Sequence, residues 1–362
     1  MLLPCHRCIA KRRIILQAVL DDVIEPVLAT AMAEPRPRRP RVIVTRRLTP
    51  SIETRMAELF DARFNREDTP FDRAQLAAAM AEAEVLVPTI TDQIDAELIA
   101  GAGDQLKLIA NFGSGIDHID LKAARKRGII VTNTPGVLTE DAADMTMALV
   151  LSVPRRLADG ERLIRSGGWQ GWAPTAMLGH RINGKRLGIV GMGRIGQAVA
   201  RRARGFGMAV HYHNRRRLPE AAERESKALF WPSLDAMLGE IDILSIHCPH
   251  TPETHHLIDA RRIALLPTHA YLINIARGEI IDEAALVDAL EGGRIAGAGL
   301  DVYGKEPALD SRLLARPDVM LLPHMASATF EARDATGEKV IANIRFWSDG
   351  HRPPDQIFEG WV

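Results

Sequence analysis

The chain has 362 residues, of which 46% are hydrophobic and 25% are charged, a composition typical of a globular protein with room for two domains. Its 46 lysine and arginine residues balance 46 aspartate and glutamate residues, so the formal net charge is zero. This balance gives no support to a nucleic-acid partner or a membrane partner, although a local cluster of positive groups can still bind a small anionic substrate.

The first 40 residues are expected to form a disordered or non-native extension. The apolar run at 14–20 follows three basic residues, but acidic residues interrupt it soon afterwards and it is too short to span a bilayer. Met32 offers an alternative start of the chain. The arginines that alternate with prolines at 36–41 allow two readings, a nucleic-acid arm or a solvated tail, and the tail is favoured.

The three cysteines do not resemble a disulfide framework, which indicates a cytoplasmic protein. Cys5 and Cys8 have the spacing of a metal or redox motif, and Cys248 stands alone. Because no second pair of ligands lies near the first two cysteines, we expect no metal site there.

Short β-rich runs alternate with helical stretches over the first part of the chain after Arg41. The expected strands are VIVT (42–45), VLVP (85–88), LKLIAN (106–111) and GIIVTN (128–133), and helices are expected near 51–60, 73–83 and 119–127. Strands separated by helices indicate a parallel sheet with crossover helices. Unbroken apolar runs fit strands that are covered on both faces.

A long helix is expected from about Glu140 to Arg165, with Thr139 as its N-cap. A second alternating series follows, with strands RLGIVG (186–191), AVHYHN (209–214), ILSIHC (243–248), AYLINI (270–275), AGAGLD (296–301) and VMLLP (319–323). The last helical stretch, about 328–348, is expected to pack back on the first series. The predicted fold class is α/β, with two doubly wound parallel sheets.

A glycine-rich turn follows the first strand of the second series. Gly191, Gly193 and Gly196 have G-x-G-x-x-G spacing, with Arg194 and Ile195 between the last two. The preceding strand and following helix supply the context that a dinucleotide-binding turn needs. One glycine makes the turn, one lets the backbone approach a pyrophosphate, and one lets helix and strand pack closely, while the helix N-terminus faces the phosphates. The alternative is a tight turn without a ligand.

A basic turn at the end of the next strand bears on the choice of cofactor. NAD sites usually place an acidic residue about 20 positions after the glycine turn. Asn214 is 21 positions after Gly193, and Arg215, Arg216 and Arg217 follow it. No carboxylate repels a 2′-phosphate there, and guanidinium groups can bind one, so NADP(H) is predicted over NAD(H), which stays possible. The alternative is an exposed basic turn.

Three later strand ends carry candidate catalytic residues. Arg277, Glu306 and His324 stand where the carboxyl ends of parallel strands can bring them to one crevice. An arginine can hold a carboxylate and polarise a ketone, a histidine can protonate the alkoxide, and a neighbouring carboxylate keeps an imidazole oriented and favours its protonated form. Singly, each residue is more simply explained by packing, strand capping or a turn. Their order after a dinucleotide turn favours reduction of a 2-oxo acid.

Several motifs together resemble the D-isomer-specific 2-hydroxyacid dehydrogenase family, and within it the glyoxylate/hydroxypyruvate reductase branch. The matching stretches are ANFGSGIDHID (110–120), NTPGVLTEDAADMTMALVL (133–151), GIVGMGRIGQAVARRARGFGM (188–208), HCPHTPETHHLID (247–259), INIARGEIIDEAAL (273–286), AGLDVYGKEP (298–307) and LLPHMASAT (321–329). The likeness covers most of the chain past residue 40.

The resemblance implies roles for individual residues. Arg277, Glu306 and His324 match the family's catalytic trio. Backbone amides at Gly113, Ser114 and Gly115 match the loop that grips the substrate carboxylate, and the cofactor-lining positions match Pro249, Thr254, Ile275, Ala276 and Asp301. HNRRR resembles the branch that uses NADPH. One departure is Ala326, where many relatives carry glycine, and the added methyl group is expected either to crowd the nicotinamide or to trim the substrate pocket.

The resemblance also implies an organisation and an assembly. A Rossmann cofactor domain at 141–324 is expected to be inserted into a flavodoxin-like substrate domain formed by 41–140 and 325–350. A homodimer is expected, joined through the cofactor domain with an extended arm near GWQGWAPTAML.

The sequence thus predicts an enzyme that transfers a hydride from NADPH to glyoxylate or hydroxypyruvate to give the D-2-hydroxy acid. Phosphoglycerate dehydrogenase is a rival, but its longer members carry an extra regulatory domain that is not expected here. Formate dehydrogenase is disfavoured because its relatives have glutamine at the position of Glu306. A non-enzymatic dinucleotide-sensing scaffold is the rival from another class.

Overall fold

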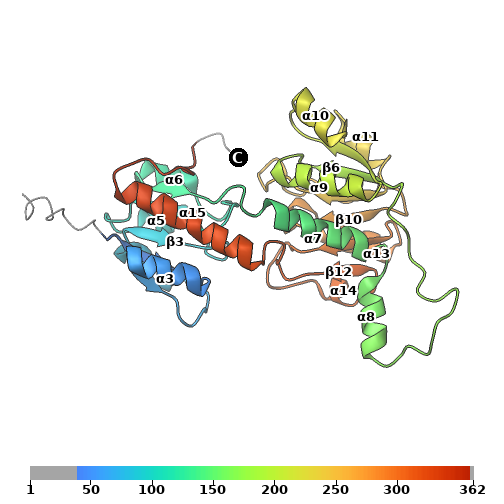
Figure 1. Cartoon of the computed structure of the whole chain (residues 1–362), viewed down its shortest axis with the longest axis horizontal. Helices are drawn as coiled ribbons and strands as arrows, with labels where there is room; N and C mark the ends of the chain where they lie inside the picture. The colour runs from blue at the N-terminus through green and yellow to red at the C-terminus, as the bar shows by residue number, and fades with distance from the viewer. Residues whose placement is uncertain (1–38, 359–362) are drawn as a thin grey trace, which may run out of the picture.

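The computed structural model describes residues 39–358 and shows two lobes side by side, each built on a parallel sheet (Figure 1). The expected extension, with Cys5, Cys8 and Met32, lies almost entirely outside the described residues. No helix within 39–358 is long and apolar enough to cross a membrane. The chain folds as an α/β protein, as predicted.

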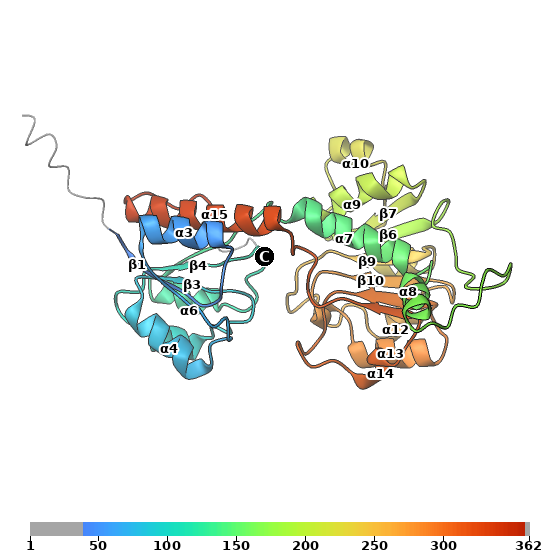
Figure 2. The ribbon, with the colours of Figure 1, turned by 60° about the horizontal axis from the view of Figure 1, so that its bottom comes forward.

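The first lobe contains a five-stranded sheet in the order β2-β1-β3-β4-β5, which is the flavodoxin-like order. Its strands are β1 (Arg41–Val44), β2 (Asp61–Phe64), β3 (Val85–Val87), β4 (Leu108–Ala110) and β5 (Ile130–Thr132). Its helices are α3 (Pro50–Leu59), α4 (Arg73–Glu82), α5 (Ala96–Ala100) and α6 (Leu121–Lys126). Figure 2 shows α3 on one face of the sheet and α4 and α6 on the other, which explains why the strand residues are apolar in unbroken runs.

The second lobe contains a seven-stranded parallel sheet in the order β12-β11-β10-β9-β6-β7-β8. Its strands are β6 (Arg186–Val190), β7 (Ala209–His213), β8 (Leu229–Phe230), β9 (Ile243–Ile246), β10 (Tyr271–Asn274), β11 (Gly297–Leu300) and β12 (Val319–Leu321). Strand β6 lies between β7 and β9, so the strand order reverses there, which is the Rossmann arrangement. Ligands of such sheets bind at this reversal, beyond the carboxyl end of the strands.

Helices cover both faces of the seven-stranded sheet. They are α7 (Thr139–Ser152), α9 (Arg194–Gly205) and α10 (Glu220–Ser226) on one side, and α11 (Leu234–Leu238), α12 (Ala260–Ile263), α13 (Glu283–Glu291) and α14 (Ser311–Leu314) mainly on the other. The short 3-10 turn η2 (Gly278–Ile280) follows β10. Two apolar clusters, one on each face, hold these layers together.

Helix α15 (Phe330–Ser348) follows the second sheet in sequence but packs on the first lobe. Its residues Val340, Ile341 and Ile344 belong to the same buried cluster as α3 and the five-stranded sheet. At its start, Asp334 accepts a hydrogen bond from Thr49 Oγ1 at 2.5 Å. The chain therefore crosses between the lobes near α7 and again before α15.

The prediction of one helix over 140–165 was wrong. The structure has α7 and a separate α8 (Leu157–Arg165), divided by a turn that includes Pro154 and Arg156. Proline lacks the N–H that a continuing helix needs, and Arg156 has a left-handed backbone (φ 55°). Thr139 is the first helical residue and not the N-cap, because Leu138 occupies the cap position. Strands β2 and β8, each at one edge of its sheet, were not predicted from the sequence because neither is a buried apolar run.

Candidate active site

The glycine turn lies at the strand reversal, between β6 and α9. Gly191 has φ +97°, and a Cβ there would lie 2.4 Å from the backbone nitrogen of Cys248. A Cβ on Gly196 would lie 2.4 Å from the carbonyl oxygen of Gly191. Both positions are therefore closed by the protein's own backbone. Gly193, the N-cap of α9, has no atom within 4 Å of an added Cβ among the described residues, so its face is open for a pyrophosphate.

The wall of this crevice comes from the segment after β9 and the turn after β10. Thr254 Oγ1 donates to the carbonyl oxygen of Pro249 at 2.7 Å, which closes the loop after β9. Ile275 is buried, and the N–H of Ala276 bonds to Oδ1 of Asn274. These residues lie at the carboxyl ends of the central strands, where a nicotinamide dinucleotide fits the open face of Gly193.

The basic turn after β7 divides its three arginines between two environments. Arg217 donates from Nε and Nη2 to the carboxylate of Glu223, each at 2.8 Å, so its guanidinium is engaged. Arg215 and Arg216 are exposed and form no ion pair within the described part of the chain. Oδ1 of Asn214 accepts a hydrogen bond from the N–H of Met192 at 2.8 Å, which ties this turn to the glycine turn. Within the described residues, two of the three guanidinium groups are therefore without an ion pair.

His324 and Glu306 form a hydrogen-bonded pair. Nδ1 of His324 lies 2.8 Å from Oε2 of Glu306, and Oε1 of Glu306 accepts the N–H of Tyr303 at 3.1 Å. Burial raises the pKa of Glu306, but the hydrogen bond and charge of His324 outweigh burial and leave that pKa below its usual value. The carboxylate therefore stays ionised and fixes Nδ1, which leaves Nε2 as the ring atom free to meet a substrate.

The loop that carries His324 is anchored by Asp301. The fully buried carboxylate of Asp301 accepts the N–H groups of Met325 and Ala326, each at 2.7 Å. These two bonds hold His324 in a left-handed backbone conformation, with φ 53°. Burial raises the pKa of Asp301, against the lowering effect of the two backbone bonds. Ala326 is buried in the apolar cluster that contains Ile275.

Arg277 follows β10 on a turn that Asn274 shapes. Nδ2 of Asn274 donates to the carbonyl oxygen of Arg277 at 2.8 Å. Gly278 lies directly against Tyr303, because a Cβ there would fall 1.9 Å from the carbonyl carbon of Tyr303. This close approach places the turn that carries Arg277 against the segment that leads to Glu306.

The loop after β4 lies opposite Arg277. Asn111 Nδ2 donates to the carbonyl oxygens of Gly113 and Gly115, at 3.0 and 2.8 Å, and Ser114 Oγ donates to the carbonyl oxygen of Thr134 at 2.8 Å. The N–H groups of Ser114 and Gly115 have no partner within 39–358. They can therefore donate hydrogen bonds to a carboxylate.

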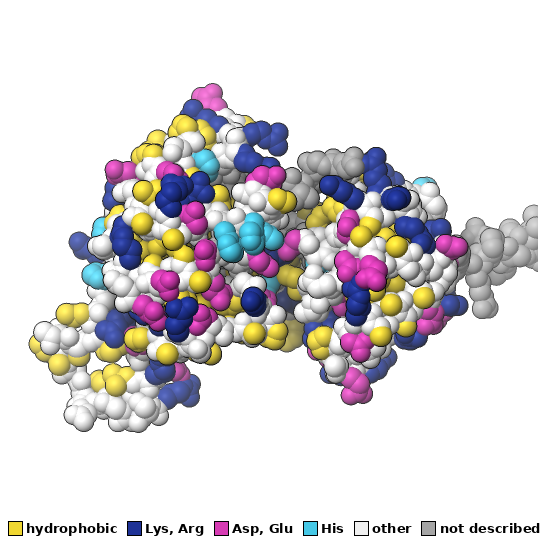
Figure 3. Space-filling model, turned by 180° about the vertical axis from the view of Figure 1, so that it is seen from behind, with side chains coloured by type: hydrophobic (Ala, Val, Ile, Leu, Met, Phe, Trp, Pro, Cys, Tyr) yellow, Lys and Arg dark blue, Asp and Glu magenta, His cyan; other side chains and the backbone are white. Residues whose placement is uncertain are grey.

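The structure thus brings the predicted trio and the predicted loop to one cleft between the lobes. Figure 3 shows the hollow between the lobes, with histidine and acidic side chains on its rim. Sequence reasoning missed Asn111, Asn274 and Asp117, the last of which pairs with Arg277. The signal for the two asparagines was present, because each is a polar residue at the end of a buried apolar strand.

Comparison with known proteins agrees with this geometry. Residues 147–326 match the family described as D-isomer specific 2-hydroxyacid dehydrogenase, NAD binding domain. The chain is similar to the glyoxylate reductase of Thermococcus litoralis, with 41% identity over 323 residues that cover 88% of this chain and 97% of that protein.

Solved structures show the same two-lobed architecture. A Polaromonas sp. JS6 66 protein assigned to the D-isomer specific 2-hydroxyacid dehydrogenases has a TM-score of 0.84 and 44% identity, covering 89% of this chain and 100% of that chain. An NADPH-dependent glyoxylate/hydroxypyruvate reductase from Sinorhizobium meliloti, in complex with NADP and malonate, has a TM-score of 0.78 and 35% identity. The match covers 88% of this chain and 97% of that chain.

Proposed function

This chain belongs to the D-isomer specific 2-hydroxyacid dehydrogenase family, and we propose that it is an NADPH-preferring reductase of glyoxylate and hydroxypyruvate. As a member it is an NAD(P)-dependent oxidoreductase that acts on a small 2-oxo acid. The observation that carries the proposal is the hydrogen-bonded His324–Glu306 pair, which lies near enough to Arg277 for the charge of Arg277 to help lower the pKa of Glu306.

The proposed mechanism assigns one step to each side chain. When bound, reduced nicotinamide would supply the hydride that adds to the carbonyl carbon of the 2-oxo acid, which is an aldehyde carbon in glyoxylate and a ketone carbon in hydroxypyruvate. Arg277 and the N–H groups of Ser114 and Gly115 hold the substrate carboxylate, and the guanidinium polarises the ketone oxygen. His324 donates a proton from Nε2 to the new alkoxide, and Glu306 holds the ring in place throughout. The neutral histidine then takes a proton from solvent.

The NADPH preference is supported by the basic turn. Arg215 and Arg216 are exposed and unpaired within 39–358, and no carboxylate stands at Asn214 to repel a 2′-phosphate. The Sinorhizobium relative was solved with NADP, which is consistent with this preference.

The substrate proposal is supported by the names of the curated relatives, which are glyoxylate reductases. The test is the loss of reduced-nicotinamide absorbance with glyoxylate, hydroxypyruvate, pyruvate, phenylpyruvate and phosphohydroxypyruvate, each with NADPH and with NADH. We expect the highest kcat/KM with glyoxylate or hydroxypyruvate and NADPH. A preference for phosphohydroxypyruvate, or for NADH, would contradict the finer assignment.

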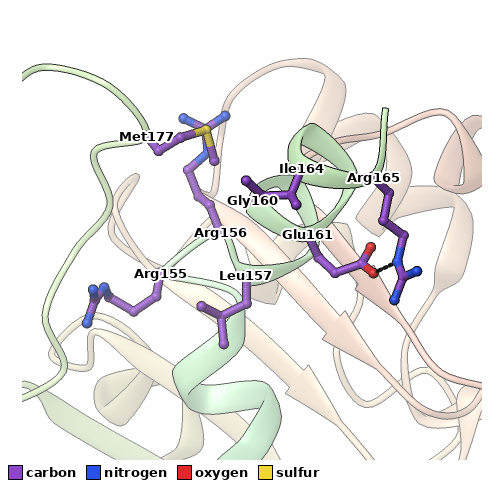
Figure 4. Close-up of a pocket in the computed structure, with 8 residues that line it drawn as sticks. All are labelled: Arg155, Arg156, Leu157, Gly160, Glu161, Ile164, Arg165 and Met177. Atoms are coloured by element: carbon purple, nitrogen blue, oxygen red, sulfur yellow. Dashed lines mark hydrogen bonds and ion pairs between the residues drawn. The ribbon is translucent and has the colours of Figure 1, made fainter. Parts of the chain in front are cut away.

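We also propose a homodimer joined through α8 and the arm that follows it, residues 166–180. Large apolar side chains are exposed there, including Trp172 at 84% and Leu178 at 66%. Figure 4 shows Leu157 and Ile164 of α8 and Met177 of the arm lining an open pocket. An apolar surface of this kind is typical of a protein interface. Light scattering of the purified protein tests this proposal, and a monomeric mass would contradict it.

A further inference from the structure

Asp117 and Arg277 join the two lobes across the cleft. Nε of Arg277 lies 3.0 Å from Oδ2 of Asp117, and Nη2 lies 3.1 Å from Oδ1. Nη1 donates instead to the carbonyl oxygen of Ala276 at 2.7 Å. The side chains of Arg277 and Asp117 are only 20% and 27% exposed, so this two-point contact is better defined than an ion pair on the open surface.

The contact leaves one edge of the guanidinium for a substrate. A guanidinium carries five N–H groups in a planar fork. Asp117 takes the side edge, formed by Nε and Nη2, and the carbonyl of Ala276 takes one N–H of Nη1. One N–H on each terminal nitrogen has no partner within 39–358. We take these two as the terminal edge of the guanidinium, with the Ala276 carbonyl bound to the Nη1 N–H beside Cδ. Such an edge can bind a carboxylate oxygen and the adjacent keto oxygen of a 2-oxo acid together.

The same loop that carries Asp117 also supplies the substrate-binding amides. A Cβ on Gly115 would fall 1.8 Å from Nη2 of Arg277, so the loop and the guanidinium are in direct contact. Asp117 is two residues after Gly115. Its carboxylate therefore sets where the free edge of Arg277 lies relative to the N–H groups of Ser114 and Gly115.

His118, the next residue, does not compete for this carboxylate. Asn111 uses its Nδ2 for the two loop carbonyls, so its Oδ1 accepts from Nε2 of His118 at 3.1 Å. Burial lowers the pKa of His118 to about 4, and its imidazole is neutral at physiological pH. Burial raises the pKa of Asp117, but the charge and hydrogen bonds of Arg277 outweigh burial and keep that pKa below its usual value. The ionised Asp117 thus has Arg277 as its cationic partner.

We propose that Asp117 is a positioning residue for the reduction, which acts through Arg277 to aim the terminal edge of the guanidinium at the substrate. The inference rests on the proposed function of the cleft. It does not require Asp117 to touch the substrate or the cofactor.

The test is the variant Asp117→Asn, which keeps the side-chain shape but removes the charge and one acceptor. We expect kcat/KM for glyoxylate to fall about 10- to 100-fold, because a small misplacement of a substrate-holding group has effects of this size. Oxamate, an unreactive mimic of a 2-oxo acid, should bind the enzyme–NADPH complex at least about 10-fold more weakly. The Kd for NADPH, measured by fluorescence, should not change.

Two further variants separate positioning from a general structural role. Asp95→Asn is the matched control, because Asp95 forms a two-point ion pair with Arg73 on the same lobe and lies outside the catalytic and binding residues. It should leave all three measurements unchanged. In an Arg277→Lys background, Asp117→Asn should change the Kd for oxamate and kcat/KM by less than about 3-fold, because the group through which Asp117 acts is already altered.

The outcomes distinguish this inference from the proposed function. Unchanged oxamate affinity and kcat/KM in Asp117→Asn would overturn the positioning role. An equal loss in both Arg277 backgrounds, or an equal loss of NADPH and oxamate binding, would also overturn it. A wild-type protein that reduces no 2-oxo acid would instead refute the proposed function, and the positioning role with it.

Discussion

The cofactor side and the substrate side of the cleft are assembled in different ways. On the cofactor side, the glycine turn and the basic turn follow two adjacent strands, β6 and β7, and Asn214 bonds directly to Met192. On the substrate side, Arg277 meets Asp117 across 160 residues of chain and between two lobes. The glycine turn and the basic turn therefore form one local unit, whereas the contact between Arg277 and Asp117 depends on how the two lobes meet.

The largest expected effect is on the substrate side. Arg277→Ala removes the cation that holds the carboxylate and polarises the ketone, and it leaves Asp117 without its partner. Steady-state kinetics should show kcat/KM reduced by about 10³-fold, the upper range for loss of one such donor. Arg261→Ala, which removes a surface ion pair with Asp235, should retain wild-type activity. If Arg277→Ala kept near-normal activity, the substrate side would be wrongly assigned.

The second prediction concerns Glu306. Glu306→Gln should lower kcat by about 10²-fold, because the ring of His324 loses its charged partner. Since the pKa of Glu306 is depressed, its contribution is present above the usual glutamate range and is lost as the pH falls through the lowered value. A plot of kcat against pH should therefore fall at acid pH for the wild-type enzyme, which is the acid limb of its profile. The Glu306→Gln variant should not show this fall. An identical acid limb in both proteins would exclude Glu306 as its source.

The third prediction concerns the cofactor side. Replacing Arg215 and Arg216 with alanine should raise the Kd for NADPH about 10- to 100-fold, the size expected for lost charge-assisted hydrogen bonds. The Kd for NADH should change by less than about 3-fold, because it has no 2′-phosphate. Arg217→Ala is the matched control, since its guanidinium is already bound to Glu223. Equal losses for both cofactors would refute the 2′-phosphate assignment.

The local geometry of the glycine turn was easier to predict from the sequence than the pairing of Arg277 with Asp117. The spacing of Gly191, Gly193 and Gly196 after an apolar strand predicts its own local geometry, because each glycine acts within a few residues of the turn. The pairing of Asp117 with Arg277 depends on the approach of two sheets, which no local pattern encodes. The division of α7 from α8 did have a local signal, Pro154, which the prediction of one continuous helix overlooked.

The smallest expected effect distinguishes two glycines of the same turn. Gly196→Ala should lower the free energy of unfolding by about 1–3 kcal/mol, since its Cβ meets the carbonyl oxygen of Gly191. Gly193→Ala should lower the free energy of unfolding by less than about 1 kcal/mol, because the space around its Cβ is open. The same substitution should weaken NADPH binding. Denaturant titrations and fluorescence measure the two effects. If the two variants lost the same stability, the space beside Gly193 would have to be filled, like the space beside Gly196.

The central claim is that hydride reaches a ketone carbon held between Arg277 and His324. The most direct measurement uses NADPH that carries deuterium at both C4 positions of the nicotinamide, with hydroxypyruvate as substrate, and locates the deuterium in the product. The account predicts D-glycerate that carries deuterium at C2. Unlabelled glycerate, the L isomer, or no product would contradict it.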